Sequence, residues 1–339
     1  MTDFASNILY TLVVRELTRQ GIAPAQSGGG TEPAPTRGTV PLADKSALLS
    51  AVYRAHGAGP LLTIGQGIRR AGPEPTLQAL LKATDPPDLL GRWQRLERYV
   101  HSRHRVLLRG QGEREMLLHH ISTRDGEVPT AAEDLLILGL ILALIGAVGA
   151  TGLTADLVPS GAGAGAGDPA GLPVWRDGAP VLTRPLDGVP TAQWRIGWEE
   201  EAAPVPGVGP EPGPEPGPEP GAAGPLPFPV AGDARALVDR LMALILADCT
   251  RPWTLDSAAR NLGQSRRTLQ RRLGEAGTSF GALVRTAQIR RATDLLLEGR
   301  LSVAEIGLLS GFSDQAHFTR EFKRRTNIPP GRYRADFAP

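Results

Sequence analysis

The last quarter of the chain contains one pattern of apolar and polar positions twice. Within residues 253–274, apolar residues three and four apart are followed by a glycine turn and by two leucines four apart. The same order returns within residues 301–326, where two phenylalanines take the places of the leucines. Spacings of three and four residues put side chains on one face of a helix, so each stretch predicts two short helices.

The turns between these helices carry residues suited to a sharp chain reversal. Gly263 and Gly311 permit the positive φ that such a turn requires. Ser265 and Ser313 follow them, and serine is a residue that caps helix N-termini. Helix, turn and helix together predict a helix-turn-helix unit, which this chain contains twice.

A third apolar stripe lies between the two units. It extends from Phe280 to Leu296 at helical spacing, and Gly299 follows as a helix stop. This pattern predicts a helix that joins the two units into one rod. Two recognition helices on one rod can enter successive major grooves of DNA, about 34 Å apart, without a dimer.

The two parts of the chain carry opposite net charge. From residue 233 onward there are 18 Lys and Arg against 11 Asp and Glu, a net of +7. Residues 1–232 hold 19 against 24, a net of −5. A basic domain gains free energy by displacing counterions from DNA, so the charge agrees with a DNA-binding C-terminal domain.

Four segments of this C-terminal part occur in the same order as in a known family of proteins. They are Gly274–Phe280, Gly311–Asp314, Phe318–Lys323 and Pro329–Arg334. Over about 85 of the 339 residues, the sequence resembles the DNA-binding domain of AraC/XylS-type transcription regulators. The resemblance implies sequence-specific binding to double-stranded DNA, with RNA polymerase as a further partner.

Two residues depart from the pattern of that family. Gly307 stands where alanine is usual, which is expected to weaken its helix by roughly 0.5–1 kcal/mol. Asn327 replaces the common glycine before the prolines. Asparagine tolerates the left-handed backbone conformation, so the turn is expected to survive.

Helical angles indicate which side chains of the two recognition helices face outward. The candidates for base contact are Arg267, Gln270, Arg271, Gln315, Ala316, His317 and Arg320, and those for phosphate contact are Arg266, Arg272, Lys323 and Arg324. Arg pairs with guanine and Gln with adenine through two hydrogen bonds each, whereas alanine offers only a contact to a thymine methyl group. Ala316 occupies the position in the second recognition helix that Arg267 occupies in the first. The first recognition helix is therefore expected to discriminate more between DNA sequences.

Glycine and proline are abundant, with 41 and 31 residues, and they concentrate in a few stretches. Gly-Pro-Glu-Pro occurs three times after residue 208. Such repeats favour polyproline II, and their glutamates repel one another, which predicts a semi-stiff spacer. We therefore expect a domain at 1–205, a linker at 206–231 and the DNA-binding domain at 232–339.

The N-terminal part alternates between helical and strand patterns. Helices are expected at 7–19, 42–54 and 87–100 and from Ala131, and a strand pair at 105–108 and 115–121. The expected fold is thus multidomain, with a mixed α/β N-terminal domain and an all-α C-terminal domain of two helix-turn-helix units joined by a helix.

This N-terminal order of elements is similar to the ligand-sensing domain of one branch of AraC/XylS regulators. The resemblance implies a small-molecule effector and a homodimer formed through this domain. An alternative is an effectorless DNA-binding protein whose first domain only dimerises.

One apolar segment is also compatible with a membrane-spanning helix. Residues 135–155 are 21 residues without a charge, long enough to cross a bilayer. Their acidic flanks, Asp134 and Asp156, are opposite to a basic cytoplasmic anchor, which favours a buried helix and no membrane partner. The alternative is a membrane-tethered DNA-binding sensor. No basic segment precedes an apolar run at the N-terminus, so we expect no signal peptide and a cytoplasmic location.

The reactive side chains point to no enzyme. Cys249 is the single cysteine and is expected to be a small buried side chain, which argues against alkyl-transfer repair by zinc-bound cysteines. His101 and His104 could share a metal with His119 or His120, but no cysteine accompanies them, and core or solvated histidines are more frequent. No phosphate loop, serine elbow or carboxylate pair stands out, so no catalytic residue, metal or cofactor is expected.

Overall fold

The computed structural model describes residues 4–23, 39–70, 74–159, 171–182, 186–201 and 232–339. The chain forms two compact units. The first consists of Met1–Arg69 and Leu80–Val208, and the second of Arg70–Ala79 and Gly209–Pro339. The repeats at 209–221 lie outside the described residues, and the domain boundaries expected from the sequence stay a prediction.

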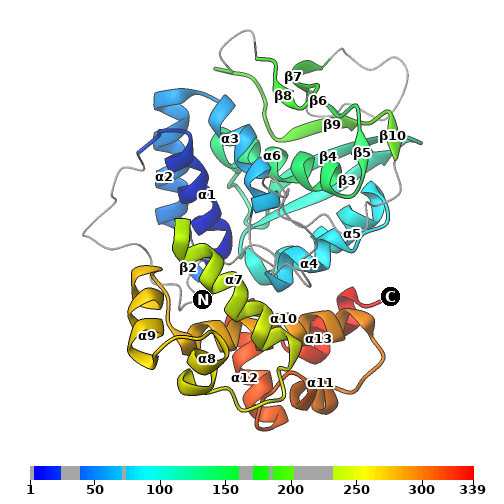
Figure 1. Ribbon diagram of the computed structural model, residues 1–339. Coiled ribbons are helices and arrows are strands. Elements are labelled where there is room, and N and C mark those ends of the chain that lie inside the picture. Colours follow the sequence, from blue (N-terminus) through cyan, green and yellow to red (C-terminus); the bar gives the residue numbers. More distant parts are fainter. Residues whose placement is uncertain (1–3, 24–38, 71–73, 160–170, 183–185, 202–231) are drawn as a thin grey trace. The chain divides into compact units, whose positions relative to one another are not determined.

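The first unit is a mixed α/β domain (Figure 1). Its helices are α1 Asn7–Arg19, α2 Leu42–His56, α3 Gly59–Thr63, α5 Pro86–Val100 and α6 Ala131–Ala147, with the 3-10 helix η1 Ile64–Arg70. Its strands are β1 Phe4–Ser6, β2 Thr39–Pro41, β3 His104–Gln111, β4 Glu115–Ser122, β5 Ala150–Thr151, β6 Thr154–Leu157, β7 Leu172–Arg176, β8 Ala179–Pro180, β9 Gln193–Gly197 and β10 Glu200–Glu201. The helices and the strand pair expected from periodicity are confirmed.

Six of these strands form one antiparallel sheet in the order β3-β4-β9-β6-β7-β8. The hairpin of β3 and β4 pairs Leu107 with His119 and contains a bulge between Leu108 and Gly110. Antiparallel pairing of neighbouring strands needs only short connections, which is why two apolar runs close along the chain revealed the hairpin.

Helix α6 explains the uncharged segment of the sequence. It ends at Ala147 after 17 residues, and β5 and β6 follow, so residues 135–155 are not one helix. Thr130 and Glu133 form a capping box at its start. A Cβ atom on Gly139 would lie 2.3 Å from the Leu62 carbonyl oxygen, so glycine here lets α3 pack directly against α6. Among the described residues, no helix is long and apolar enough to span a bilayer.

The second unit is helical. It contains α7 Gly232–Ala247, α8 Leu255–Asn261, α9 Arg266–Glu275, α10 Phe280–Glu298, α11 Val303–Leu309, α12 Gln315–Thr326 and α13 Pro330–Phe337. Helix α4 Pro75–Leu81 is shared, because residues up to Ala79 belong to this unit and the last two to the first.

Two apolar cores hold the second unit together. The first core joins α7, α8, α9 and the start of α10 through residues such as Leu241, Leu269 and Leu283. In the second core, aromatic rings contact one another in a row, tilted or edge-on with centroids 5.1 to 5.6 Å apart, from Phe312 through Phe318, Phe322 and Tyr333 to Phe337. Such contacts between ring edges and faces add to the free energy of burial.

Candidate nucleic-acid interface

The first helix-turn-helix unit consists of α8 and α9. Thr254 caps α8 in a box with Ser257, and Gly263 adopts a φ of 64° in the turn. The Ser265 hydroxyl then accepts a 3.1 Å hydrogen bond from the backbone N–H of Thr268. The capping role expected for Ser265 is therefore confirmed.

The second unit, α11 and α12, repeats this arrangement with one difference. Gly311 adopts a φ of 81°, as the turn requires, but the cap of α12 is Asp314 and not Ser313. The Asp314 carboxylate accepts a 2.7 Å hydrogen bond from the backbone N–H of His317, and this bond lowers the pKa of Asp314. The expectation for Ser313 was wrong, because its hydroxyl bonds to Asp314 at 3.1 Å instead. A carboxylate also suits the positive end of the helix dipole.

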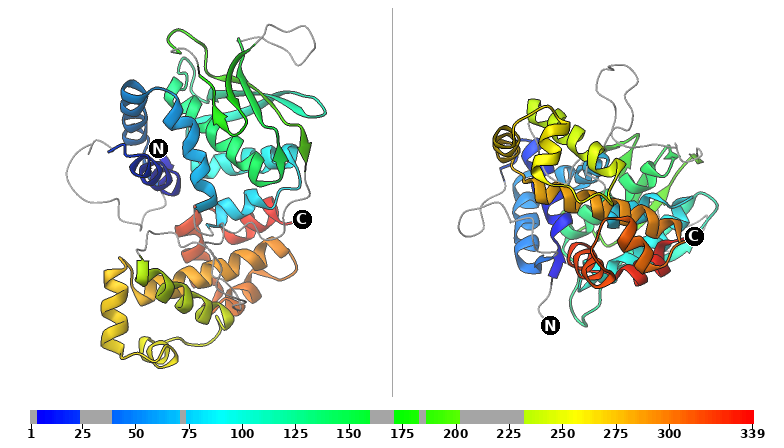
Figure 2. Two further views of the ribbon diagram at one scale, coloured as in Figure 1. Left: turned by 45° about the horizontal axis from the view of Figure 1, so that its top comes forward. Right: turned by 60° about the horizontal axis from the view of Figure 1, so that its bottom comes forward.

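Helix α10 joins the two helix-turn-helix units, as expected. Ser279 caps its start, and Gly299 ends it in the left-handed conformation with a φ of 75°. The helix packs on α7 of the first core and on α11 and α13 of the second (Figure 2). Its 19 residues correspond to about 28 Å of helix, so α9 and α12 are carried on one rigid connector.

The two departures from the family pattern are accommodated. Asn327 ends α12 with a φ of 63°, the left-handed conformation expected of it. A Cβ atom on Gly307 would lie 3.2 Å from the Cβ of Phe318, so the glycine also gives room to the aromatic core. The helical cost expected for Gly307 therefore comes with a packing benefit that the sequence did not reveal.

Most of the base-contact candidates are exposed. The exposed ones are Arg267, Gln270, Arg271, Gln315, Ala316 and Arg320. His317 is half-buried, because its ring packs edge-on against Phe312 with centroids 5.4 Å apart. Its Nδ1 atom also lies 3.1 Å from the Ser313 hydroxyl. His317 thus supports the turn in addition to lying near the outward face.

The phosphate candidates flank these residues. Arg266, Lys323 and Arg324 are exposed, and Arg272 is half-buried. Arg266 lies 3.4 Å from Asp256, and Arg324 forms an ion pair with Glu321. Exposed ion pairs contribute about 0–1 kcal/mol, so a phosphate can replace the acidic partner at little cost. The arrangement is two outward helix faces rich in cationic and amide donors, carried on one rod.

The α/β domain holds a group of buried polar side chains of which the sequence had indicated only the histidines. This buried polar cluster consists of Lys45, His101, His104, His120, Glu133 and Asp134, all less than 9% exposed. The rings of His101 and His104 stack with centroids 4.7 Å apart, and His120 Nδ1 lies 2.7 Å from Asp134. Lys45 lies on α2, and Glu133 and Asp134 lie on α6. His101 follows the end of α5, and His104 and His120 lie on β3 and β4, so only tertiary structure completes the cluster.

Hydrogen bonding sets the protonation of His101. Its Nδ1 accepts the backbone N–H of His104 at 3.1 Å, and its Nε2 lies 3.1 Å from Lys45 Nζ. A neutral imidazole carries one N–H, so the hydrogen of the ring is on Nε2 and faces the Lys45 amine, which disfavours the charged ammonium. Burial lowers the pKa of Lys45 to about 8, and burial first, then Lys45, also lowers the pKa of His101.

The metal hypothesis is not supported by this geometry. His119 is half-exposed, and its ring lies 3.4 Å from Arg109, away from His101 and His104 in the cluster. Among the described residues, no group of three or more His, Cys, Asp or Glu side chains is arranged to hold a metal ion. Cys249 is buried, as expected, and burial raises the pKa of its thiol to about 11.

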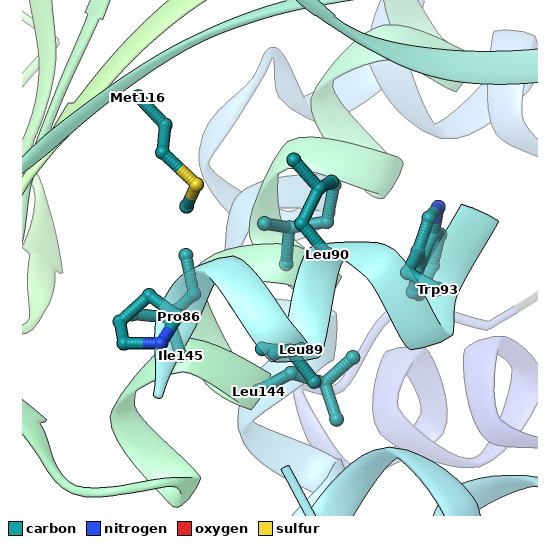
Figure 3. A pocket seen from close by; sticks show the side chains of 8 residues that line it. Pro86, Leu89, Leu90, Trp93, Met116, Leu144 and Ile145 are labelled. Carbon is teal, nitrogen blue, oxygen red and sulfur yellow. The ribbon is translucent and has the colours of Figure 1, made fainter. Parts of the chain in front are cut away.

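A small apolar cavity lies in the α/β domain between α5, α6 and β4. It is lined by Pro86, Leu89, Leu90, Trp93, Met116, Ile141, Leu144 and Ile145 (Figure 3). Its volume is about 10 Å³, at the lower limit for holding a single water molecule.

Comparison with known proteins places the C-terminal region. Residues 258–336 match a family model described as a helix-turn-helix domain. The ornithine utilization regulator of Pseudomonas aeruginosa is 36% identical over 98 residues, which are 29% of either chain. The transcriptional activator RhaR of Klebsiella pneumoniae is 29% identical over 107 residues, 31% of this chain and 38% of the relative.

Solved structures also match part of the chain. A transcriptional regulator from Chromobacterium violaceum, described as containing an AraC-type DNA-binding domain, is 30% identical with a TM-score of 0.30. The match covers 31% of this chain and 95% of that chain. The C-terminal region, which contains two helix-turn-helix units, is therefore similar in sequence to the helix-turn-helix domains of transcription regulators. The chain spans less than two fifths of the length of the curated relatives named above.

Proposed function

We propose that this protein is a sequence-specific DNA-binding regulator of transcription. The observation that carries the proposal is the presence of two helix-turn-helix units with exposed recognition faces on one connecting helix. The net charge of +7 from residue 233 onward supports it, because counterion release from DNA favours a basic surface. RNA polymerase as a partner and dimerisation through the first domain are part of the proposal.

Roles of individual side chains follow from their placement. Arg267, Gln270 and Arg271 lie exposed on α9 and offer donors in the geometry that base edges accept. Ala316 and Arg320 lie exposed on α12, where alanine offers only an apolar contact. The proposal therefore assigns most of the sequence discrimination to α9, and positioning on phosphate to the flanking arginines and lysine.

Binding-site selection with the full chain tests this function. The protein is incubated with random duplex DNA, the bound fraction is sequenced, and affinity for the selected site is measured from 50 to 200 mM salt. We expect a recurrent motif and an affinity that falls steeply as salt rises. No binding at 50 mM salt, or an affinity that is independent of salt, would refute the proposal.

We further propose that a small apolar effector acts on the first domain through the cavity between α5, α6 and β4. Its lining is apolar throughout, which suits an apolar ligand. Typical ligand sites have volumes of about 300–1,000 Å³, so binding has to open this site and thereby move α5 or α6. An effector with different affinities for the closed and opened forms would shift their populations.

Thermal shift with a panel of small apolar molecules tests this control. We expect at least one molecule to raise the melting temperature of the full chain, and the variant Leu90→Phe, which fills the cavity, to abolish the shift. Val128→Phe is the control, because Val128 is 84% exposed and far from any core role. If no molecule shifts the melting temperature, the effectorless dimeric alternative gains support.

A further inference from the structure

A short segment that lies within the first domain in sequence is a structural part of the second unit. Residues 70–79 belong to the helical unit, although along the chain they begin at the last residue of η1 and end before α5. Pro75 occupies the first turn of α4, where its fixed φ suits a helix start, and Glu74 precedes it. The described part of this segment, 74–79, is called the docking segment below.

An ion pair joins the docking segment to the second recognition helix. Arg325 of α12 binds both carboxylate oxygens of Glu74, with Nε 3.2 Å from Oε2 and the guanidinium NH2 group on Oε1. The Glu74 side chain is only 7% exposed and that of Arg325 is 31% exposed. Two parallel N–H···O bonds fix the orientation of the pair in addition to its charge. A carboxylate this buried needs its cation, because an unpaired buried charge is costly.

Two further contacts extend the interface along α13 and α10. The hydroxyl of Tyr333, which is fully buried, donates a 2.5 Å hydrogen bond to the carbonyl oxygen of Pro75. The amide Nε2 of Gln78 lies 3.4 Å from Asp294 Oδ1. The ring of Tyr333 packs against Phe322 with centroids 5.2 Å apart, so the docking segment is anchored on the aromatic core beneath α12.

Helix α4 continues without interruption from the docking segment into Leu80 and Leu81, which belong to the first unit. We propose that residues 74–79 form a second connection between the domains, made by contacts and independent of the linker at 206–231. Through it, a displacement of α4 in the first domain is transmitted to α12 by way of Arg325 and Tyr333.

A cleavable form of the full chain tests this proposal without any reference to DNA binding. A protease site is inserted into the 206–231 segment, the protein is cleaved, and association of the two fragments is measured by size-exclusion chromatography and by titration. We expect the fragments to remain associated. Complete separation of the wild-type fragments at micromolar concentration would overturn the proposal.

Matched variants show whether the docking segment holds the fragments together. Arg325→Gln is expected to raise the dissociation constant of the two fragments at least about tenfold. The control is Arg324→Gln, at the residue directly before it in α12, which is expected to change this constant less than about twofold. The exchange Glu74→Arg with Arg325→Glu is expected to recover part of the loss. Equal effects of the two arginine variants, or no recovery in the exchange, would overturn the proposal. The exchange also separates loss of the ion pair from misfolding of Arg325→Gln.

Discussion

The carbonyl oxygen of Cys249 occupies the space that a side chain on Gly311 would need. A Cβ atom on Gly311 would lie 2.0 Å from that oxygen, well inside van der Waals contact. The Gly311 carbonyl in turn accepts a 2.7 Å hydrogen bond from Gln288 of α10. The turn of the second helix-turn-helix unit is thus held between the end of α7 and the connecting helix.

The two turn glycines form a natural pair for mutation. Gly311→Ala is expected to destabilise the second unit by about 3 kcal/mol or more, because backbone strain and a clash with Cys249 add together. Gly263→Ala is expected to cost only about 1–2 kcal/mol, since its φ is similar but nothing lies within 4 Å of the added atom. Amide exchange of α8 to α12 measures both. Similar losses for the two variants would contradict the role given to Cys249.

The two arginines of α9 that differ in exposure test the division of labour on DNA. Arg267→Ala is expected to cost about 1–3 kcal/mol on the selected site and to relax preference at one base pair. Arg272→Ala, which is half-buried on the flank, is expected to weaken all sequences alike. Site selection with each variant decides this. Unchanged sequence preferences in both would show that the outward face of α9 was assigned wrongly.

Buried ionisable side chains make the stability of the first domain depend on pH. Burial lowers the pKa of His104 to about 4, against 6.5 for an accessible histidine. The unfolded chain therefore binds more protons between these values, so this stabilising contribution is present above pH 6.5 and is lost as the pH falls toward 4. Burial also raises the pKa of Glu97 to about 7, against a usual 4.5. Its contribution has the opposite sign, because it is present below pH 4.5 and is lost as the pH rises to 7.

Two variants separate these opposing contributions. Glu97→Gln is expected to make the loss of stability between pH 6.5 and 4.5 steeper, because the compensating titration is removed. His104→Phe is expected to make it shallower, by an amount on the order of 3 kcal/mol at pH 4. Urea unfolding of the full chain at several pH values, followed by amide exchange in α5 and α6, measures the slopes. Parallel pH profiles for wild type and both variants would rule out this account.

Shortening the linker tests its role as a tether. Deleting residues 209–216, which removes two repeats, is expected to leave single-site DNA affinity within about threefold, a change below about 0.7 kcal/mol. Occupancy of paired sites at long separation is expected to change, because linker length sets the effective concentration of the second site. One-site and two-site DNA probes are compared at equal protein concentration and salt. A large loss on the one-site probe would mean that the linker itself binds the DNA-binding domain.

The sequence by itself determined the elements whose formation depends on residues close along the chain. The periodicity of α8 to α12, the positive φ of Gly263 and Gly311, the cap at Ser265 and the stop at Gly299 were all predictable. Helical spacing, turn glycines and capping side chains act within one or two turns, so a single sequence carries their signal. The hairpin of β3 and β4 belongs to the same class, since its partners are neighbours.

The tertiary structure alone decided the features that depend on distant residues. Glu74 and Arg325 are separated by 251 positions, and Lys45 and His101 by 56. No local pattern marks either pair, because the two side chains need each other only after folding has brought them together and removed water from around them. Even whether Asp314 or Ser313 caps α12 depends on where the preceding turn ends. Contacts with Cys249 and Gln288 hold that turn in place. Periodicity determines which face of a helix is apolar, whereas the partner of a buried charge depends on how the whole chain packs.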